Sequence, residues 1–282
     1  MGAMDGLITA DGCRLQLHRW PVTGTAPEAA QGTVQIVHGL GEHMGRYAGV
    51  AAALNAAGWH VVGHDHRGHG RSEGAHGAVP PGPGLLGDLA QVMDHLRGPG
   101  RHVLLGHSMG GLVAARFVAE ALQAAPAPWS RPVDGLVLSS PALDAGLGPV
   151  QKLLLAVLGP LAPDLRVNNG LKSEWVSRDP ELVRRYDADP LVHDRITPRL
   201  VRFIVDNGAF VLQQAHAWRV PTLLLWAGAD RCVSPAGSAA FAAAAPAGVV
   251  QATPFAELYH EIFNEPERAQ VLAQLVRWLT VV

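Results

Sequence analysis

The sequence predicts a doubly wound α/β domain in which helices flank a mostly parallel central sheet. Short apolar runs alternate with segments of helical spacing, and continuous apolar runs are typical of parallel strands buried on both faces. The length of 282 residues suits one such domain with an insertion. The expected strands are 33–37, 59–63, 102–105, 135–138 and 222–226, with a weaker sixth at 249–252. The expected helices include 48–57, 110–123, 239–247 and 267–279.

Polar residues gather where these strands end. His38 and Gly39 follow the first strand, the loop 64–74 follows the second, and Asp230 comes shortly after the fifth. The carboxyl ends of parallel strands meet at one edge of a sheet, and ligands bind there in open α/β folds. We therefore expect the functional residues at this edge.

Between residues 141 and 219 the alternation of strand and helix stops. Proline-punctuated helices are expected near 150–158, 180–186 and 198–217. We interpret 141–219 as a helical cap inserted over the strand ends, with 1–140 and 220–282 as the two parts of the main α/β unit. The alternative is that these helices simply flank the sheet.

Composition excludes some classes of partner and leaves others open. The net charge is −2 and no basic run is present, so no nucleic-acid partner is expected. The N-terminal segment lacks the pattern of a signal peptide and no apolar run is long enough to span a bilayer, so we expect a cytoplasmic protein. Cys13 and Cys232 do not make a disulfide framework, although one bond between them stays open. We favour a structural role for the segment around Cys232.

The candidate nucleophile is Ser108, which stands in the sequence G-H-S-M-G between an expected strand and an expected helix. A serine on such a sharp turn exposes its hydroxyl in a strained backbone conformation, and a Cβ two residues to either side would collide with neighbouring elements. The motif alone is weak, but the strand and helix around it supply the context that it needs.

Serine needs a base to take its proton, and the base needs a third group to orient it. The chain order serine, acid, histidine leaves few assignments, because His260 is the only histidine after Asp230. Asp230 is the expected acid, although an aspartate at such a junction often only caps a helix. Asp206 is the weaker alternative, since it falls inside a cap helix.

Two backbone N–H groups are expected to stabilise an oxyanion. The N–H of Met109 follows the nucleophile, and a glycine-rich turn after the first strand offers the N–H of Leu40. The histidine-rich loop 64–70 could coordinate a metal, but we favour a polar loop whose side chains bond to one another and to backbone beneath the oxyanion turn. We therefore expect no metal. His107 is expected to be a pocket wall or a hydrogen-bonding group rather than the base.

Further short segments extend these motifs along most of the chain; they are 38–43 with Arg46 and Tyr47, 65–74, 106–111, 177–180, 189–192, and 259–261 with Asn264 and Glu265. Together they resemble the monoacylglycerol lipases and lysophospholipase-like serine hydrolases of the α/β-hydrolase superfamily. The resemblance implies an α/β-hydrolase fold with a mobile apolar cap. It also implies hydrolysis of a single-chain acyl ester by Ser108, Asp230 and His260 without a cofactor.

The same resemblance implies contacts with a small lipid or ester substrate. Glu42 and Arg46 match positions near a polar head-group pocket, but they could equally form an ion pair within their loop. Apolar residues of the cap, Leu143, Leu154 and Leu158 among them, could line an acyl channel or pack against the main unit. Leu40 is larger than the residue that some members carry at the oxyanion turn, which would narrow the pocket.

Several alternatives remain open at this point. On the same triad, the protein could be a short-chain carboxylesterase, a lysophospholipase, a thioesterase or an acyltransferase. A non-catalytic ligand-binding module is the alternative from another class. Contact between the cap and a membrane or micelle is also open, and the sequence does not determine the oligomeric state.

Overall fold

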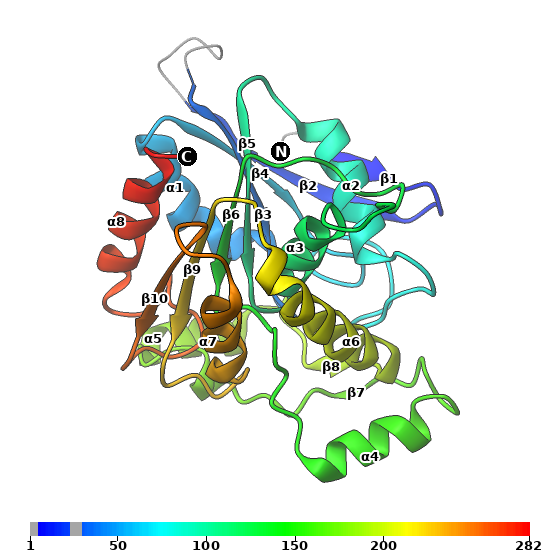
Figure 1. Ribbon diagram of the computed structural model, residues 1–282. Coiled ribbons are helices and arrows are strands. Elements are labelled where there is room, and N and C mark those ends of the chain that lie inside the picture. Colours follow the sequence, from blue (N-terminus) through cyan, green and yellow to red (C-terminus); the bar gives the residue numbers. More distant parts are fainter. Residues whose placement is uncertain (1–4, 23–29) are drawn as a thin grey trace.

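The computed structural model describes residues 5–22 and 30–282 (Figure 1). Within this part of the chain, eight strands form one sheet in the order β1-β2-β4-β3-β5-β6-β9-β10. Their bounds, in that order, are Gly6–Ile8, Arg14–Trp20, Trp59–His64, Gly32–Val37, Arg101–His107, Gly135–Ser139, Thr222–Ala227 and Val250–Phe255. The strands from β4 to β10 pair in parallel, whereas β1 and β2 pair antiparallel. All six predicted strands are confirmed, and the two antiparallel strands were not predicted.

Helices cover both faces of the sheet (Figure 1). One layer holds α1 (Ala48–Ala56) and α8 (Arg268–Leu279), and the other holds α2 (Leu85–Leu96), α3 (Ser108–Glu120), α6 (Pro198–Gln214) and α7 (Pro235–Ala244). Alternate residues of β5 serve the two layers: Leu104 packs under α3, while Val103 and Leu105 pack under α1 and α8. This alternation explains why the strands are apolar without interruption.

The segment between β6 and β9 contains α4 (Pro149–Leu158), α5 (Pro180–Ala188) and α6, close to the predicted helices. Two-residue strands, β7 (Val167–Asn168) and β8 (Arg195–Ile196), pair antiparallel beside them. In Figure 1, α4 projects away from the sheet at the lower right.

Of these helices, α6 lies differently from the prediction, because it packs on α3 and α7 of the main unit. The physical reason is topological: β6 and β9 are parallel neighbours, so the chain must return to the opposite end of the sheet before β9 begins. The helix α6 makes that return, and therefore flanks the sheet. Residues 141–197 are the part of the predicted cap that does not take part in this return.

Two further findings bear on the sequence-based expectations. Cys13 and Cys232 are both free thiols, so the disulfide that was left open is not formed. In the described part of the chain, no helix is both long enough and apolar enough to cross a bilayer.

Candidate active site

Ser108 is the first residue of α3 and directly follows β5. Its φ of 54° places it in the left-handed region, which is costly for a residue with a side chain. The flanking glycines make this turn feasible: a Cβ on Gly106 would lie 2.5 Å from the carbonyl oxygen of Gly110, and one on Gly110 would lie 2.1 Å from that of Val37. The strained turn expected from the sequence is therefore present.

His260 and Asp230 are directly paired, with Nδ1 of the imidazole 2.7 Å from Oδ2 of the carboxylate. The other oxygen, Oδ1, accepts hydrogen bonds from the backbone N–H groups of Cys232 and Val233, at 2.8 and 3.1 Å. Asp230 thus both orients the histidine and holds its own loop. Asp206, the alternative acid, is exposed on α6.

Ser108 and His260 line the same cavity. Among the contacts of the described residues, no hydrogen bond joins the two side chains. Such catalytic hydrogen bonds are often long without substrate and tighten when it binds.

Electrostatics prepare His260 to hold a proton. Burial disfavours its charged form, but the Asp230 carboxylate, its hydrogen bond, and the nearby Glu261 and Glu42 carboxylates outweigh burial and raise the pKa of His260 above its ordinary value. Asp230 is also buried, yet the charge and hydrogen bond of His260 lower the pKa of its carboxyl. The pair favours an imidazolium held against a carboxylate, the state that a general base reaches after accepting a proton.

The turn that was expected to hold the oxyanion follows β3 and is fixed by Glu42. One oxygen of this buried carboxylate accepts hydrogen bonds from the N–H of Gly39 and the hydroxyl of Tyr47, at 2.6 and 2.7 Å. Leu40 and Met109 both line a cavity together with Ser108, as the oxyanion prediction requires. The backbone assignment itself stays a prediction.

Arg46 joins three parts of the molecule. Its guanidinium contacts both oxygens of Glu261 at 2.5 and 2.7 Å and one oxygen of Glu42 at 3.1 Å. Its Cζ lies 4.6 Å from the centre of the Tyr186 ring on α5. When ionised, two carboxylates share one guanidinium, which leaves a net negative charge beside His260. We call Glu42, Arg46 and Glu261 the buried ion cluster.

Burial affects the two carboxylates of this cluster unequally. Burial raises the pKa of Glu42 despite the nearby guanidinium, whereas the charge and hydrogen bonds of Arg46 outweigh burial and lower the pKa of Glu261. The ion pair is thus centred on Arg46 and Glu261. Of the two readings left open for Arg46, the ion pair with Glu42 in its own loop is present, and Arg46 lines neither cavity beside Ser108.

Two cavities meet at Ser108. One has a volume of about 490 Å³ and is walled largely by polar residues, including Glu42, His107 and His260. The other has a volume of about 410 Å³ and is walled mainly by apolar residues of α3, α4 and α6 and of the loops around them. The residues that line both are Leu40, Ser108, Asn169, Leu171 and Cys232.

The remaining predicted contacts divide into three groups. Leu154 lines the apolar cavity and His107 lines the polar one, where its Nδ1 lies 3.1 Å from the Ser139 hydroxyl. Leu143 is 3% exposed, packs in the main core and lines neither cavity, so the packing alternative holds for it and the substrate contact does not. The side chain of Leu158 lies outside the described part of the structure.

The histidine-rich loop packs beneath the oxyanion turn. The backbone N–H of His66 donates to His38 Nε2 at 2.8 Å, and His66 Nε2 lies 3.0 Å from the carbonyl oxygen of His38. Burial lowers the pKa of His66 and His69 to about 3, so both are neutral near pH 7. This agrees with the polar loop that we favoured.

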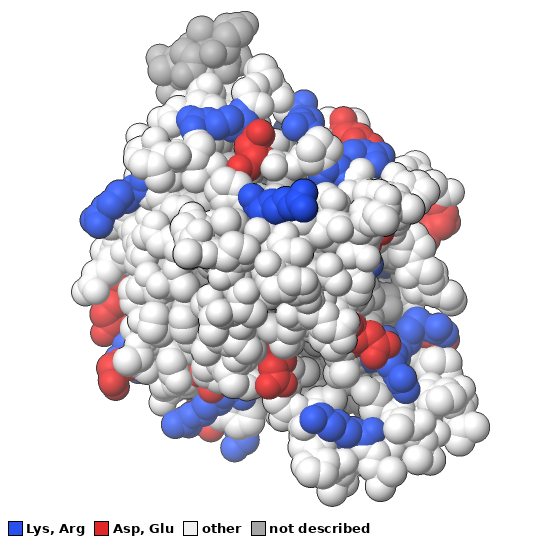
Figure 2. Space-filling view, in the orientation of Figure 1, with Lys and Arg blue, Asp and Glu red and all other residues white. Residues whose placement is uncertain are grey.

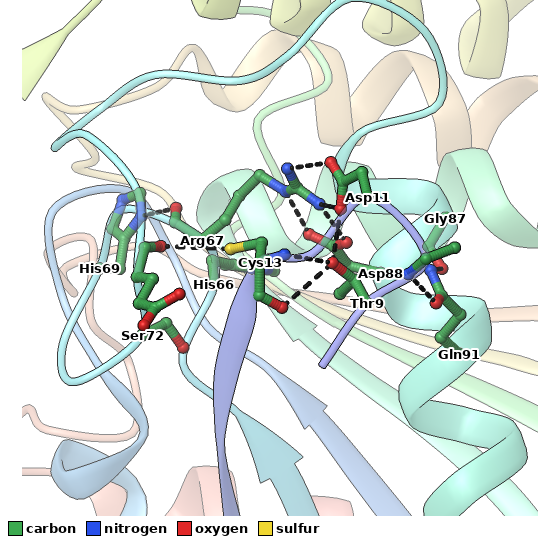
Figure 3. A network of polar contacts seen from close by, with 12 residues as sticks. Thr9, Asp11, Cys13, His66, Arg67, His69, Ser72, Gly87, Asp88 and Gln91 are labelled. Atoms are coloured by element: carbon green, nitrogen blue, oxygen red, sulfur yellow. Dashed lines mark hydrogen bonds and ion pairs between the residues drawn. The ribbon is translucent and has the colours of Figure 1, made fainter. Parts of the chain in front are cut away.

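Arg67 attaches this loop to the rest of the domain. Its guanidinium forks between Asp88 of α2, at 2.6 Å, and Asp11 in the β1–β2 turn, at 2.9 Å (Figure 3). Asp88 is almost fully buried. The loop below the oxyanion turn is therefore tied to two elements that are distant in sequence.

Sequence reasoning missed three contributors to the site. Glu261 and Tyr186 complete the surroundings of Arg46, and Cys232 lies where the two cavities meet. An acidic residue directly after the expected catalytic histidine was a usable signal for Glu261. No local sequence pattern predicts the role of Tyr186, because this residue and Arg46 come into contact only in the folded structure.

Comparison with known proteins places this site in a family. The family described as Hydrolase_4, serine aminopeptidase S33, matches residues 28–267. The chain belongs to this family. A monoacylglycerol lipase of Mycolicibacterium smegmatis is 37% identical to it over 88% of each chain. Phospholipase YtpA of Bacillus subtilis is 31% identical over 84% of this chain and 91% of the relative.

A solved structure agrees with these relatives. The monoacylglycerol lipase of Paleococcus ferrophilus superposes with a TM-score of 0.79 at 33% identity, covering 94% of this chain and 98% of that one. The predicted family and the α/β-hydrolase fold are confirmed. The predicted class of enzyme, a serine hydrolase of carboxylic esters, is confirmed as well.

Proposed function

We propose that this protein is a monoacylglycerol lipase that releases a fatty acid and glycerol. The observation that carries this proposal is the position of Ser108 at the junction of a polar and an apolar cavity. An ester bound there would place its acyl chain on the apolar side and its alcohol on the polar side. Both volumes lie in the range usual for small-molecule sites.

The proposed mechanism uses the residues of the junction. The Ser108 hydroxyl attacks the ester carbonyl while His260 takes its proton, and the N–H groups of Leu40 and Met109 stabilise the oxyanion. Asp230 keeps the imidazole oriented and stabilises its charged form. His260 then protonates the leaving glycerol, and water activated by His260 releases the fatty acid.

The charge of the polar cavity favours a neutral alcohol over a phosphate ester. The carboxylates that line it are those of Glu42, Glu174, Asp187, Asp189, Asp194 and Glu261. Lys172 is the one lysine or arginine among the described lining residues. Carboxylates repel an anionic phosphate, and the negative groups outnumber the positive one in this lining. A lysophospholipase is the second candidate, because one relative is named a phospholipase.

We propose further that residues 141–197 act as the cap and that α4 contacts a micelle or membrane. Several apolar side chains of α4 are exposed to solvent: Val150, Leu153 and Val157 are 70%, 64% and 55% exposed. In Figure 2 the corresponding lobe at the lower right is largely uncharged. Exposed apolar surface of this kind commonly marks an interaction site, and α4 also walls the apolar cavity through Leu154 and Leu155.

The test compares substrates of one acyl chain length. Initial rates are measured on a monoacylglycerol, the matching lysophosphatidate and lysophosphatidylcholine, the p-nitrophenyl ester and the acyl-coenzyme A thioester. Ser108→Ala is the control for the mechanism. We expect the monoacylglycerol to give the highest kcat/KM and the Ser108→Ala variant to lose hydrolysis and labelling by a fluorophosphonate.

Each other outcome overturns a specific part of the proposal. Preference for either lysophospholipid would favour the phospholipase reading, and preference for the thioester would favour a thioesterase. Activity confined to short p-nitrophenyl esters would make the protein a small-ester carboxylesterase. Full activity in Ser108→Ala would overturn the mechanism itself.

A further inference from the structure

We propose that Asp230, Cys232 and His260 form a binding site for a soft divalent cation such as Zn²⁺, and that the bound ion inhibits the enzyme. The proposed inhibition rests on the proposed function, because it blocks the catalytic histidine. The binding itself does not depend on which ester is cleaved.

The geometry of the three side chains carries the proposal. Each offers one donor atom, and the three atoms lie within 4.8 Å of one another. A tetrahedral ion with bonds of about 2.0–2.3 Å holds its donors roughly 3.3–3.7 Å apart. To match this spacing, Nδ1 of His260 and Oδ2 of Asp230, now 2.7 Å apart, would have to separate by roughly 0.6 Å. The Cys232 sulfur, which lies within 4.8 Å of the other donors, would have to approach by at most about 1 Å.

An ion can reach these donors from solvent. Cys232 lines both cavities, and His260 lines the polar one. Asp230 lies behind them, with its side chain 1% exposed. Three protein donors and an open fourth position toward the cavity match the arrangement of zinc sites that keep a water or substrate ligand.

The charge around the donors favours a cation. Asp230 and the buried ion cluster contribute three carboxylates against the single guanidinium of Arg46. The polar cavity, through which the ion would enter, carries the further carboxylates described above. Thiolate and imidazole donors select Zn²⁺ over Mg²⁺, so we expect the site to discriminate between these ions.

Binding would remove the general base by simple coordination. The Cys232 thiol loses its proton to solvent as the metal–sulfur bond forms, and no other covalent bond changes. An ion bound by both Asp230 and His260 takes Nδ1, the ring nitrogen that faces the carboxylate, and replaces the hydrogen bond between the two residues. The imidazole then carries its proton on Nε2, so it has no free lone pair to accept the Ser108 proton and attack by Ser108 stops.

The test titrates Zn²⁺ into the full-length protein and follows both ester hydrolysis and the rate of fluorophosphonate labelling of Ser108. Cys232→Ser and Cys232→Ala are compared with Cys13→Ser, which removes the other thiol far from the site. Each variant is normalised to its own rate without metal. We expect EDTA-reversible inhibition by Zn²⁺ and none by Mg²⁺. Loss of a ligand should raise the half-inhibitory concentration by about tenfold or more in both Cys232 variants, and Cys13→Ser should match wild type.

A second measurement does not depend on activity. Co²⁺ bound to the site should give a thiolate-to-metal charge-transfer band that disappears in Cys232→Ser and persists in Cys13→Ser. Equal Zn²⁺ sensitivity in wild type and both Cys232 variants, or an unchanged Co²⁺ band in Cys232→Ser, would overturn the proposal. An inactive wild type that still shows the Cys232-dependent band would instead refute the proposed function and leave the site standing.

Discussion

Arg46 and Glu261 form a two-bond ion pair, with the guanidinium nitrogens 2.5 and 2.7 Å from the carboxylate oxygens. Arg46 belongs to the short 3₁₀ helix Met44–Tyr47, which follows the turn proposed to hold the oxyanion, and Glu261 directly follows His260, the proposed base. The pair therefore connects the two sides of the reaction centre. It also holds the negative charge of Glu261 close enough to His260 to raise the pKa of the imidazole.

The first prediction concerns the pH dependence of the reaction. Glu261 is one of the carboxylates that raise the pKa of His260, so Glu261→Gln should lower that pKa. The free enzyme is active only when His260 is neutral, and the acid limb of kcat/KM should therefore move to lower pH. The measurement is kcat/KM from about pH 5 to 9. Glu267→Gln, which changes an exposed carboxylate paired with Arg178, is the matched control and should leave the acid limb at its wild-type pH. An acid limb at the wild-type pH in both variants would contradict the prediction.

The second prediction separates the two candidate acids. Asp230→Asn keeps the shape of the side chain but removes the charge that stabilises the imidazolium, and kcat should fall by about 10⁴. Asp206→Asn alters an exposed residue of α6 and should retain wild-type kcat. Circular dichroism would establish that both variants are folded. A large loss in Asp206→Asn with an active Asp230→Asn would reverse the assignment.

The third prediction tests the close packing at the nucleophile. In Gly110→Ala the new Cβ would stand 2.1 Å from the backbone oxygen of Val37, so the turn must shift and activity should be lost. Gly49→Ala in α1 meets nothing within 4 Å and should stabilise the helix by about 0.5–1 kcal/mol. Thermal unfolding and ester hydrolysis of the two variants provide the comparison. An active Gly110→Ala enzyme would show that the turn tolerates a side chain.

The fourth prediction compares two Arg–Asp pairs on α2. Asp88→Ala removes a carboxylate that is 1% exposed and leaves Arg67 with Asp11 alone, which should cost about 3–5 kcal/mol. Asp94→Ala removes a half-exposed carboxylate paired with Arg131 and should cost less than about 1 kcal/mol. Urea unfolding gives both values. Similar losses in the two variants would mean that burial does not decide the strength of the Arg67 pair.

The fifth prediction concerns acid stability. Burial lowers the pKa of His66, His69 and His193 to about 3, and that of His64 to about 4, from an ordinary 6.5. The unfolded chain therefore takes up protons first, so stability is present above about pH 6.5 and falls below it. Each such histidine costs about 1.4 kcal/mol per pH unit below 6.5. The Tm should drop steeply between about pH 6.5 and 5, and a constant Tm over that range would contradict the buried, neutral state.

Local patterns predicted much of this fold. The parallel strands are continuous apolar runs that begin and end near their expected residues, because burial on both faces leaves no room for polar side chains. The β2 strand was missed because it mixes Gln16, His18 and Arg19 with apolar residues and pairs antiparallel near the sheet edge. For α6 the less favoured alternative, a helix that flanks the sheet, is the one observed, since the order of β6 and β9 in the sheet requires a return helix.

The residues of the site likewise divide into those that local sequence indicates and those whose contacts depend on the fold. Ser108, Asp230 and His260 could be proposed from sequence because each lies at the end of a strand or in a loop whose position follows from chain order, and their catalytic roles stay predictions. For Arg46 the sequence left a substrate contact and an ion pair within its loop both open, and it could not indicate Glu261, which is 215 positions away and reaches Arg46 only in the fold. Leu143 was left open between channel and core because an apolar residue at the start of a cap gives no sign of which one it faces; the structure places it in the core.

The course of the chain around α6 has a consequence for how this protein could diversify. Residues 141–197 begin after the carboxyl end of β6 and finish where α6 starts its return, so both ends of the segment lie on the same side of the sheet. Within this segment, Val176 and Tyr186 contact the residues around His260, whereas α4 exposes Val150, Leu153 and Val157, so changes confined to α4 would disturb the site least. Over generations, substitutions confined to α4 could therefore reshape one wall of the apolar cavity, and with it the range of acyl chains accepted, while the residues around Ser108 are inherited unchanged.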